Sequence, residues 1–363
     1  MLDINVLKSE ERAIFALRGL YKQYGYQPFK MSKFEEYDLY VRNKDFLVSD
    51  RVITFNDTDG RLLALKPDVT LSIIKNTKKS PYDKQKVCYN ETVYRVSGAT
   101  GQYKEIMQTG IECIGDIDMS DAFEVVELAA KSLSLISPDY VLDISHMGIV
   151  TAFLAEAQGG KEFNKRITSL IAEKNSHEIV SLCEEQGISK SAAAKLSALA
   201  GMYGKREKVI ESLAPLCESE EAKAALAEMK ALSEYFSARG IGDSVRFDFS
   251  VVNNMKYYNG IVFKGFLSGI SEGVLAGGEY DNLLAAMKLS SRGIGFALYL
   301  DRLSELDIQA DEYDVDILLL YDAGTPSADL ASQKDKYIAL GKTVYAATCA
   351  PEKIRYRELV RVK

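Results

Sequence analysis

The chain has 363 residues, of which 47% are hydrophobic and 27% are charged, and its formal net charge at pH 7 is −7. These values predict a globular protein of two or three domains with a sizeable apolar core. The acidic balance argues against an extensive nucleic-acid surface, because such surfaces are usually basic.

The numbers and spacings of cysteine and histidine narrow the range of sites that we expect. The five cysteines have no CxxC spacing, which is typical of reduced thiols in a cytoplasmic protein. The two histidines, His146 and His177, lie far apart, so we expect neither a histidine-based metal site nor a Ser–His–Asp triad. No apolar run reaches the roughly 18 residues of a membrane span, and the N-terminus has no signal-peptide pattern, so we expect no membrane segment.

The first expected elements are a helix and a hairpin. Ser9–Tyr24 predicts an amphipathic helix that has Ser9 as its N-cap and acidic residues in its first turn. Residues 52–56 and 62–65 predict two strands joined by the turn sequence DTDG.

The hairpin leads into the sequence LKPDVT, which carries two polar side chains directly before an apolar helix. Pro67 holds the backbone extended, and Asp68 and Thr70 follow at a spacing of two. Asp and Thr are common helix caps, so these residues have two interpretations. Either they cap the following helix, or they contact a ligand.

The most informative stretch lies between residues 87 and 115. Val87–Ser97 and Ile106–Gly115 predict long antiparallel strands, separated by the small-residue loop SGATGQ. Side chains two residues apart share a strand face, so Gln108, Gly110 and Glu112 look the same way. This face is either the exposed polar side of a sheet or the floor of a site for a ligand with an ammonium or imidazole group.

Helical patterns dominate the middle of the chain. A capping box at Asp121 and Glu124 predicts a helix to about Ile136, and residues 140–145 predict a buried strand. From about residue 148 to residue 240, strand patterns disappear and Ala, Glu, Lys and Leu predominate. This composition predicts a helical segment inserted between two β-rich parts of the chain.

Strand patterns return at Val245–Val252. Tyr257 and Tyr258 follow and are expected on a strand, where neighbours face opposite sides; they form either a core pair or one core and one ligand contact. Next, Gly277 and Gly278 allow a tight bend or the close approach of a ligand.

The end of the chain combines a glycine-marked segment with a short α/β pattern. Residues 291–303 predict a strand end or turn followed by a helix, on which Arg302 either forms a surface ion pair or contacts an anion. A strand at 315–320, a helix at 327–340, a strand at 343–347 and a locally basic end complete the pattern.

Together these motifs resemble the catalytic core of the class II histidyl-tRNA synthetase family and, within it, the regulatory subunits of ATP phosphoribosyltransferase. The resemblance covers about residues 5–306 and includes the helical insertion. It rests on four motifs in the family's order, which are LKPDVT, residues 93–115, the pair NNMKYYNGIVF and AGGEYDNL, and residues 293–303.

The resemblance implies a pocket for free histidine. Its six residues would be Asp68, Thr70, Gln108, Glu112, Tyr258 and Tyr280. Asp68 and Thr70 would hold the amino group with support from Gln108. Glu112 and Tyr258 would contact the imidazole. Buried polar groups of this kind discriminate well, because a ligand without the matching groups leaves them unpaired.

The phosphate-contacting part of the family pattern is retained only in part. Arg95 and Arg302 match arginines that contact the nucleotide phosphates, and we interpret them as vestigial. The synthetase arginine beside the reacting carboxylate is matched by Asn253, and the glutamate after the first arginine is matched by Ser97. Two further synthetase arginines are matched by Lys66 and Gln102. Losing positive groups aimed at developing charge weakens transition-state stabilisation, so the pattern argues against an adenylating enzyme.

The resemblance thus implies an α+β fold with a class II synthetase-like antiparallel sheet flanked by helices. The expected domains are a core at 1–147 and 241–306, a helical insertion at 148–240 and a truncated α/β segment at 307–363. From Asp311 only 53 residues remain, too few for a full anticodon-binding domain.

The function implied is that of a non-catalytic regulatory subunit of short-form ATP phosphoribosyltransferase. It would activate the catalytic subunit, take part in feedback inhibition by histidine, and act as a homodimer within a hetero-oligomer, with no cofactor, metal, nucleic acid or membrane partner. Two alternatives stay open. One is a divergent histidyl-tRNA synthetase or stand-alone histidine-activating enzyme, and the other is a nucleic-acid-binding module that uses the basic C-terminal residues.

Overall fold

The computed structural model describes residues 7–47, 51–77, 84–96, 100–252, 257–307 and 313–362. The chain divides into two compact units, residues 1–304 and residues 305–363, and this division lies near the boundary expected at residue 306. No helix within the described ranges is long and apolar enough to cross a lipid bilayer.

In its described residues, unit 1 is built on a nine-stranded sheet with the order β1-β5-β6-β12-β11-β10-β7-β9-β8. The strands are β1 (Gln27–Pro28), β5 (Gln85–Val96), β6 (Tyr103–Gly115), β7 (Tyr140–His146), β8 (Tyr203–Gly204), β9 (Val245–Asp248), β10 (Ile261–Leu267), β11 (Leu275–Glu279) and β12 (Arg292–Tyr299).

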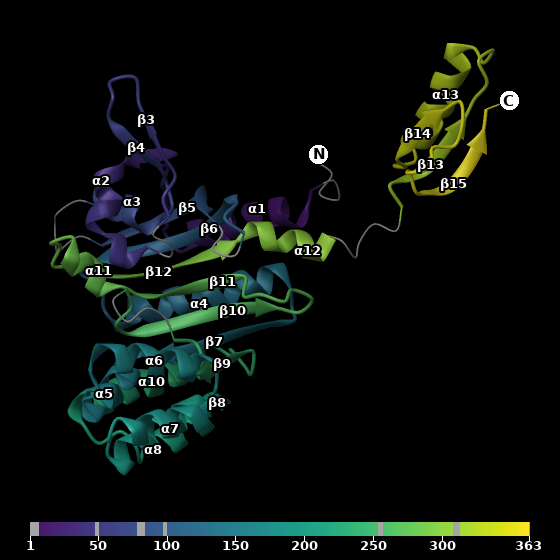
Figure 1. The fold of residues 1–363 in the computed structure, drawn as a ribbon. Coiled ribbons are helices and arrows are strands. Elements are labelled where there is room, and N and C mark those ends of the chain that lie inside the picture. The colour runs from purple at the N-terminus through teal and green to yellow at the C-terminus, as the bar shows by residue number, and fades with distance from the viewer. Residues whose placement is uncertain are drawn as a thin grey trace. The chain divides into compact units, whose positions relative to one another are not determined.

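The middle of this sheet is antiparallel from β5 through to β7, while the β1–β5 and β7–β9 pairs are parallel. Figure 1 shows the strands from β5 to β8 stacked in this order. The predicted α+β class with an antiparallel sheet is therefore confirmed, and the parallel pairs lie toward its two ends.

Two long helices cover one face of the sheet. Helix α4 (Met119–Ile136) packs on β6, β7, β10, β11 and β12, and helix α1 (Ser9–Gln23) packs on α4 and β5. Leu133 of α4 fills the space above Gly265 of β10. Because side chains alternate along a strand, Lys264 and Phe266 point to the opposite face, which carries the cavity described below.

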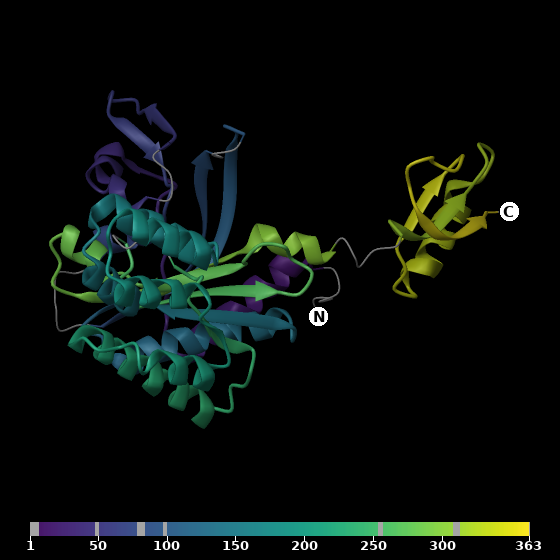
Figure 2. The ribbon, with the colours of Figure 1, turned by 60° about the horizontal axis from the view of Figure 1, so that its bottom comes forward.

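A smaller layer supplies the first wall of that cavity. Strands β2 (Phe34–Glu36), β4 (Leu62–Leu65) and β3 (Thr54–Asn56) form an antiparallel sheet in this order, accompanied by α2 (Tyr37–Arg42), the short 3-10 helix η2 (Lys44–Phe46) and α3 (Thr70–Asn76). The β3–β4 hairpin projects from the rest of unit 1 (Figure 2).

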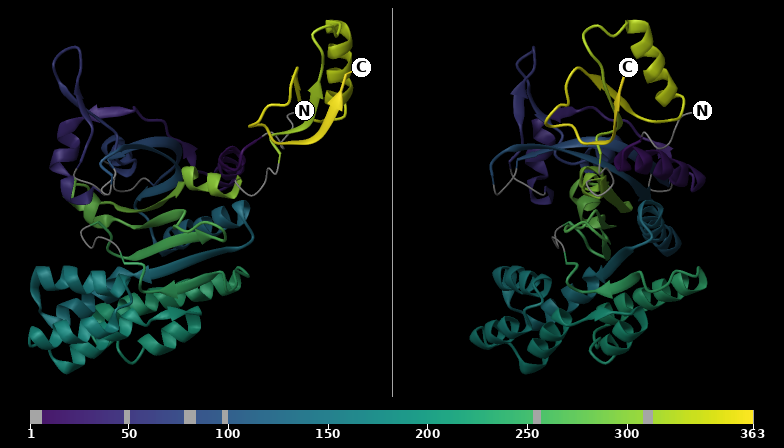
Figure 3. Two further views of the ribbon diagram at one scale, coloured as in Figure 1. Left: turned by 45° about the vertical axis from the view of Figure 1, so that its right-hand side comes forward. Right: turned by 90° about the vertical axis from the view of Figure 1, so that its right-hand side faces the viewer.

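The segment between β7 and β9 is helical, as predicted. It contains α5 (Met147–Ala157), α6 (Gly160–Ala172), α7 (Ser176–Glu185), α8 (Lys190–Ala200), α9 (Arg206–Leu213) and α10 (Glu220–Ala238), with only the two-residue β8 joining the sheet. Figure 3 shows these helices gathered beyond the β9 end of the sheet. Their treatment as a separate domain at 148–240 stays a prediction, because they belong to unit 1.

Unit 2 is a small α/β layer. Its described residues form a parallel sheet, β14-β13-β15, from β13 (Val315–Leu320), β14 (Val344–Ala347) and β15 (Tyr356–Arg361), with helix α13 (Ser327–Ile338) between β13 and β14. Strand β15 was not predicted, because basic residues interrupt its apolar residues and leave no alternating pattern.

Several local predictions are wrong. Helix α4 begins at Met119 and is capped by Asp118, whose Oδ1 accepts hydrogen bonds from the backbone N–H groups of Ser120 and Asp121, so the box lies three residues before the predicted one. Helix α1 begins at Ser9, with Lys8 in the N-cap position. Strand β9 ends at Asp248, whereas the prediction extended it to Val252.

The free cysteines fit the prediction of reduced thiols. Four of them are buried, and Cys349 is exposed. No group of His, Cys, Asp or Glu side chains suited to a metal ion is present among the described residues.

Candidate functional site

A cavity of about 680 Å³ lies on the sheet face of unit 1 opposite α4. This volume is within the range of sites for small organic ligands. All eight residues singled out from the sequence line it, namely Asp68, Thr70, Arg95, Gln108, Glu112, Tyr258, Tyr280 and Arg302. Their grouping in one cavity is observed, whereas their ligand roles stay predictions.

Small residues of the sheet form the floor of the cavity, and their lack of side-chain bulk leaves the space open. In the pairing of β6 with β12, Glu112 lies opposite Gly295, Gly110 opposite Ala297, and Gln108 opposite Tyr299. On β11, Ala276 continues the row of Ala297. This register removes side-chain bulk from the centre of the face and leaves the polar groups of β6 at its edge.

Glu112 is held at two points, and its side chain is only 2% exposed. The hydroxyl of Thr70 donates to its Oε1 over 2.7 Å, and the hydroxyl of Tyr280 donates to its Oε2 over 2.6 Å. A carboxylate accepts about four hydrogen bonds, so Glu112 retains acceptor capacity for a ligand. A β-carbon at position 295 would lie 1.8 Å from Oε2, so only glycine leaves room for this carboxylate.

The segment before α3 serves both as a cap and as a cavity wall. Asp68 Oδ1 accepts a hydrogen bond from the backbone N–H of Leu71 over 2.9 Å, so the capping interpretation holds for Asp68. Thr70 is the first residue of α3 and directs its hydroxyl to Glu112. The two interpretations from the sequence are therefore compatible, because both side chains also line the cavity.

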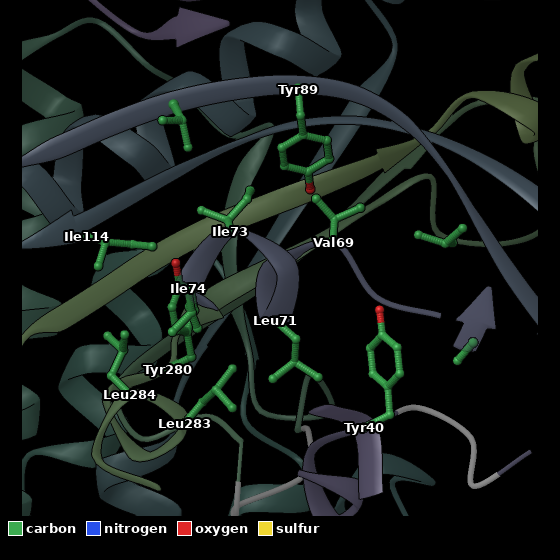
Figure 4. Close-up of a cluster of buried hydrophobic side chains, with 13 residues drawn as sticks. Tyr40, Val69, Leu71, Ile73, Ile74, Tyr89, Ile114, Tyr280, Leu283 and Leu284 are labelled. Carbon is green, nitrogen blue, oxygen red and sulfur yellow. The ribbon is translucent and has the colours of Figure 1, made fainter. Parts of the chain in front are cut away.

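A hydrophobic cluster fixes this segment against the sheet. Figure 4 shows Leu71, Ile73 and Ile74 of α3 beside Tyr280, and Leu283 and Leu284 of α11 (Asp281–Ala286) close by. Removing this much apolar surface from water holds α3 and Tyr280 in place, at roughly 2 kcal/mol for each fully buried side chain. The polar groups of the cavity are thus positioned by apolar packing behind them.

The two adjacent tyrosines are arranged differently from the prediction. Tyr257 and Tyr258 precede β10, which begins only at Ile261, so they are not alternating strand residues. Their ring centroids are 4.5 Å apart, Tyr257 lies 6.1 Å from Tyr280, and both tyrosines line the cavity. Tyr257 was therefore not predicted as a site residue, although the adjacent aromatic pair was the available signal.

The glycines at 277 and 278, and those in residues 291–303, also differ from the prediction in their surroundings. Gly278 has φ +159° and lies in the row of Gly295, next to the ring of Tyr258. Gly277 instead packs against Phe263 and Phe296. Residues 292–299 form the continuous strand β12, so of the two predicted alternatives the strand is observed and the turn is wrong. A helix follows as predicted, but it is short: the 3-10 helix η3 (Leu300–Leu303), which carries Arg302, and then α12 (Ser304–Asp307).

At the acidic end of the cavity, burial raises the pKa values of two carboxyl groups. Burial raises the pKa of Glu112 to about 8, against the opposite effect of the hydrogen bonds from Tyr280 and Thr70. Burial also raises the pKa of Asp68, although the Leu71 N–H and the charge of Arg95 act in the opposite direction. The positive charge of an ammonium or imidazolium group would favour ionisation of both acids, so this end suits a cationic ligand group.

The other end of the cavity is basic. Lys264 and Arg302 lie there with the carboxylate of Glu272, while Arg95 also lines the cavity but lies closer to Asp68. Arg95 Nε donates to the carbonyl oxygen of Pro67 over 3.0 Å. The Arg302 guanidinium lies over the Tyr299 ring at 4.7 Å and forms a 2.7 Å ion pair with Glu272. Lys264 and Glu272 were missed, since an isolated charge on a strand or loop carries no distinguishing pattern.

Of the four positions that depart from the synthetase pattern, the structure describes Lys66 and Gln102. Lys66 is fully buried and forms a 2.8 Å ion pair with Glu91, so its charge is neutralised. Gln102 is exposed. Asn253 and Ser97 lie outside the described residues.

We expect Gly295→Ala to displace the Glu112 side chain and to lower the free energy of unfolding by about 1–3 kcal/mol, because the new methyl group overlaps the Glu112 carboxylate. Gly19→Ala is the matched control, because a β-carbon at this helical position meets nothing within 4 Å and should stabilise by about 0.5–1 kcal/mol. Urea unfolding measures both effects. Equal stability of the two variants would contradict the packing described for Gly295.

The comparisons with known proteins agree with this architecture. The family model described as "Histidyl-tRNA synthetase" matches residues 5–303. A protein from Clostridium kluyveri named ATP phosphoribosyltransferase regulatory subunit is 30% identical over 292 residues, which are 78% of this chain and 74% of that protein.

Two solved structures share the fold. The Bacillus halodurans structure titled "ATP phosphoribosyltransferase regulatory subunit/histidyl-tRNA synthetase" has a TM-score of 0.74 and 24% identity, and covers 97% of this chain and 93% of that one. An ATP phosphoribosyl transferase (HisG:HisZ) complex from Thermotoga maritima has a TM-score of 0.63 and 21% identity, with coverage of 82% and 97%.

The antiparallel sheet with a polar cavity on its open face defines a class II aminoacyl-tRNA synthetase-like protein. The chain belongs to the histidyl-tRNA synthetase family and, within it, to the ATP phosphoribosyltransferase regulatory subunits.

Proposed function

We propose that the chain is a non-catalytic regulatory subunit that binds free histidine in the cavity of unit 1. It pairs with a short-form ATP phosphoribosyltransferase catalytic subunit, activates it, and takes part in its feedback inhibition by histidine. The observation that carries this proposal is the carboxylate of Glu112, buried at the acidic end and held by Thr70 and Tyr280.

The acidic end supports histidine as the ligand. Histidine carries an ammonium group and an imidazole, and both donate hydrogen bonds to carboxylates. Asp68 and Glu112 supply two acceptors, and Gln108 supplies an amide near them. Tyr258 and Tyr280 add aromatic walls, on which a cationic or flat ring packs favourably.

The pairing of the basic side chains of the cavity argues against catalysis. Adenylation needs fixed positive groups aimed at the developing charge of the phosphate. In the cavity, Arg302 is already paired with Glu272, and Arg95 donates its Nε–H to a backbone carbonyl. Lys66 is buried in an ion pair with Glu91. The names of the relatives favour the same conclusion, since they describe a regulatory subunit.

The second candidate is a histidine-activating enzyme, and the presence of Arg95, Lys264 and Arg302 in one cavity favours it. Exchange of pyrophosphate into ATP in the presence of histidine separates the two functions. The regulatory proposal requires no exchange above background, and robust histidine-dependent exchange would establish the enzyme instead.

Mixing the purified chain with a short-form catalytic subunit should yield a stable hetero-oligomer that contains a dimer of this chain. We expect the transferase rate to rise by about tenfold or more on assembly, and added histidine to lower it, because histidine binds two states of the assembly unequally. Size-exclusion chromatography and a coupled activity assay measure these effects. Absence of a complex, or a complex with the rate of the catalytic subunit alone, would refute the regulatory role.

A further inference from the structure

We propose that Glu272 is an intramolecular competitor for Arg302, and that it lowers the affinity of the cavity for phosphate-bearing ligands. The inference rests on the proposed function, since it explains how a cavity with a basic end is kept for an amino acid. It assigns a specificity-determining role to a residue in the loop between β10 and β11.

The geometry of the pair carries the first step. Glu272 Oε2 lies 2.7 Å from a terminal nitrogen of Arg302, within the distance of a charge-assisted hydrogen bond. The Arg302 side chain is 28% exposed and is also restrained by the Tyr299 ring at 4.7 Å. A phosphate that approached this guanidinium would meet the Glu272 carboxylate, which occupies one of its nitrogens and repels a second anion.

The position of Glu272 suits a competitor rather than a packing residue. Its side chain is 69% exposed, although it lines the cavity. It lies in the connection from Leu267 to Leu275, beside Gly273, whose missing β-carbon leaves room for the Lys264 side chain. An exposed carboxylate of this kind gains little stability from its ion pair, so a ligand with more negative charge can displace it.

The charge balance of the cavity supplies the second step. Three cationic side chains line the cavity, and so do three carboxylates, those of Asp68, Glu112 and Glu272. The carboxylate of Glu272 therefore offsets part of the positive charge that a polyphosphate meets in the cavity. Removing this one carboxylate frees Arg302 in a cavity that Arg95 and Lys264 also line, and several cationic side chains in one cavity favour binding of phosphate groups.

The test uses Glu272→Gln in the full chain and inorganic tripolyphosphate as the probe. We expect the variant to bind tripolyphosphate about tenfold more tightly than the unmodified protein at low ionic strength, measured by isothermal titration calorimetry. Glu220→Gln is the matched control, because Glu220 is 87% exposed and ion-paired with Lys223 on α10, outside the cavity. This control changes the net charge equally and should leave the affinity unchanged.

A double variant, Glu272→Gln with Arg302→Gln, identifies the cation responsible and should lose the gain. Equal tripolyphosphate affinity in Glu272→Gln and the unmodified protein would overturn the proposal, as would a gain that survives in the double variant. Histidine binding by Glu272→Gln is measured in parallel. Its absence in every protein would refute the proposed function, while the tripolyphosphate result would still decide the role of Glu272.

Discussion

Replacing Glu112 with glutamine is expected to lower the affinity for free histidine by at least about a hundredfold, because the change removes a buried carboxylate acceptor and leaves the ligand donors without it. Glutamine keeps the shape of the side chain, and its amide can still pair with the hydroxyls of Thr70 and Tyr280. The loss would therefore reflect lost recognition rather than a collapsed cavity. Calorimetric titration of histidine measures the effect.

The matched control is Glu279→Gln. Glu279 is also a buried carboxylate of the same sheet, but it pairs with Arg292 and the backbone N–H of Ile261 and does not line the cavity. Thermal unfolding of both variants checks that each is folded. Unchanged histidine affinity in Glu112→Gln would exclude Glu112 from recognition. An equal loss in folded Glu279→Gln would show that any buried charge of the sheet has the same effect.

The second large effect concerns stability and pH in the absence of ligand. The pKa of Glu112 is about 8 in the folded protein and near 4.5 when the side chain is exposed, so the folded state holds one more proton between these values. The free energy of unfolding should then fall by about 1.4 kcal/mol for each pH unit across this window, which amounts to about 5 kcal/mol in total. Stability from this group is fully present below pH 4.5 and is lost as the pH rises through 8.

Urea unfolding of the unmodified protein and of Glu112→Gln from pH 5 to pH 9 isolates this contribution. The difference between the two proteins should change with pH in the stated direction, with the variant the more stable one at pH 9. Glu220→Gln, which removes an exposed carboxylate, should follow the unmodified protein. Parallel stability curves for Glu112→Gln and the unmodified protein would show that Glu112 ionises normally.

Local patterns predicted much of the fold, because each depends on neighbours in the sequence. The residue types in 87–97 and 106–115 predicted the paired strands β5 and β6, and their alternation placed Gln108 and Glu112 on one face, as observed. The helical composition of residues 148–240 likewise gave α5 to α10. The family resemblance predicted that Tyr258 and Tyr280 line the same site as residues 68–112. No local pattern would have joined residues so far apart in the sequence.

The errors arise where tertiary contacts override local patterns. Tyr257 and Tyr258 look like strand residues, yet they stack together beside Tyr280 in the cavity before β10 begins. The glycines of β12 look like a turn, yet their role is to accept Glu112 and Tyr280 from neighbouring segments. The pairing of Glu272 with Arg302 joins residues 30 positions apart through a loop whose course no pattern encodes.

The hydrogen bond between Glu112 and Tyr280 joins residues 168 positions apart, with the whole helical segment between them. Contacts so distant in the chain add a loop-closure cost and form slowly during folding. We therefore expect the cavity to be completed late in folding, after α5 to α10 have formed. Substitutions that weaken the docking of β11 and β12 should therefore impair ligand capture from a distance, without altering any atom that meets the ligand.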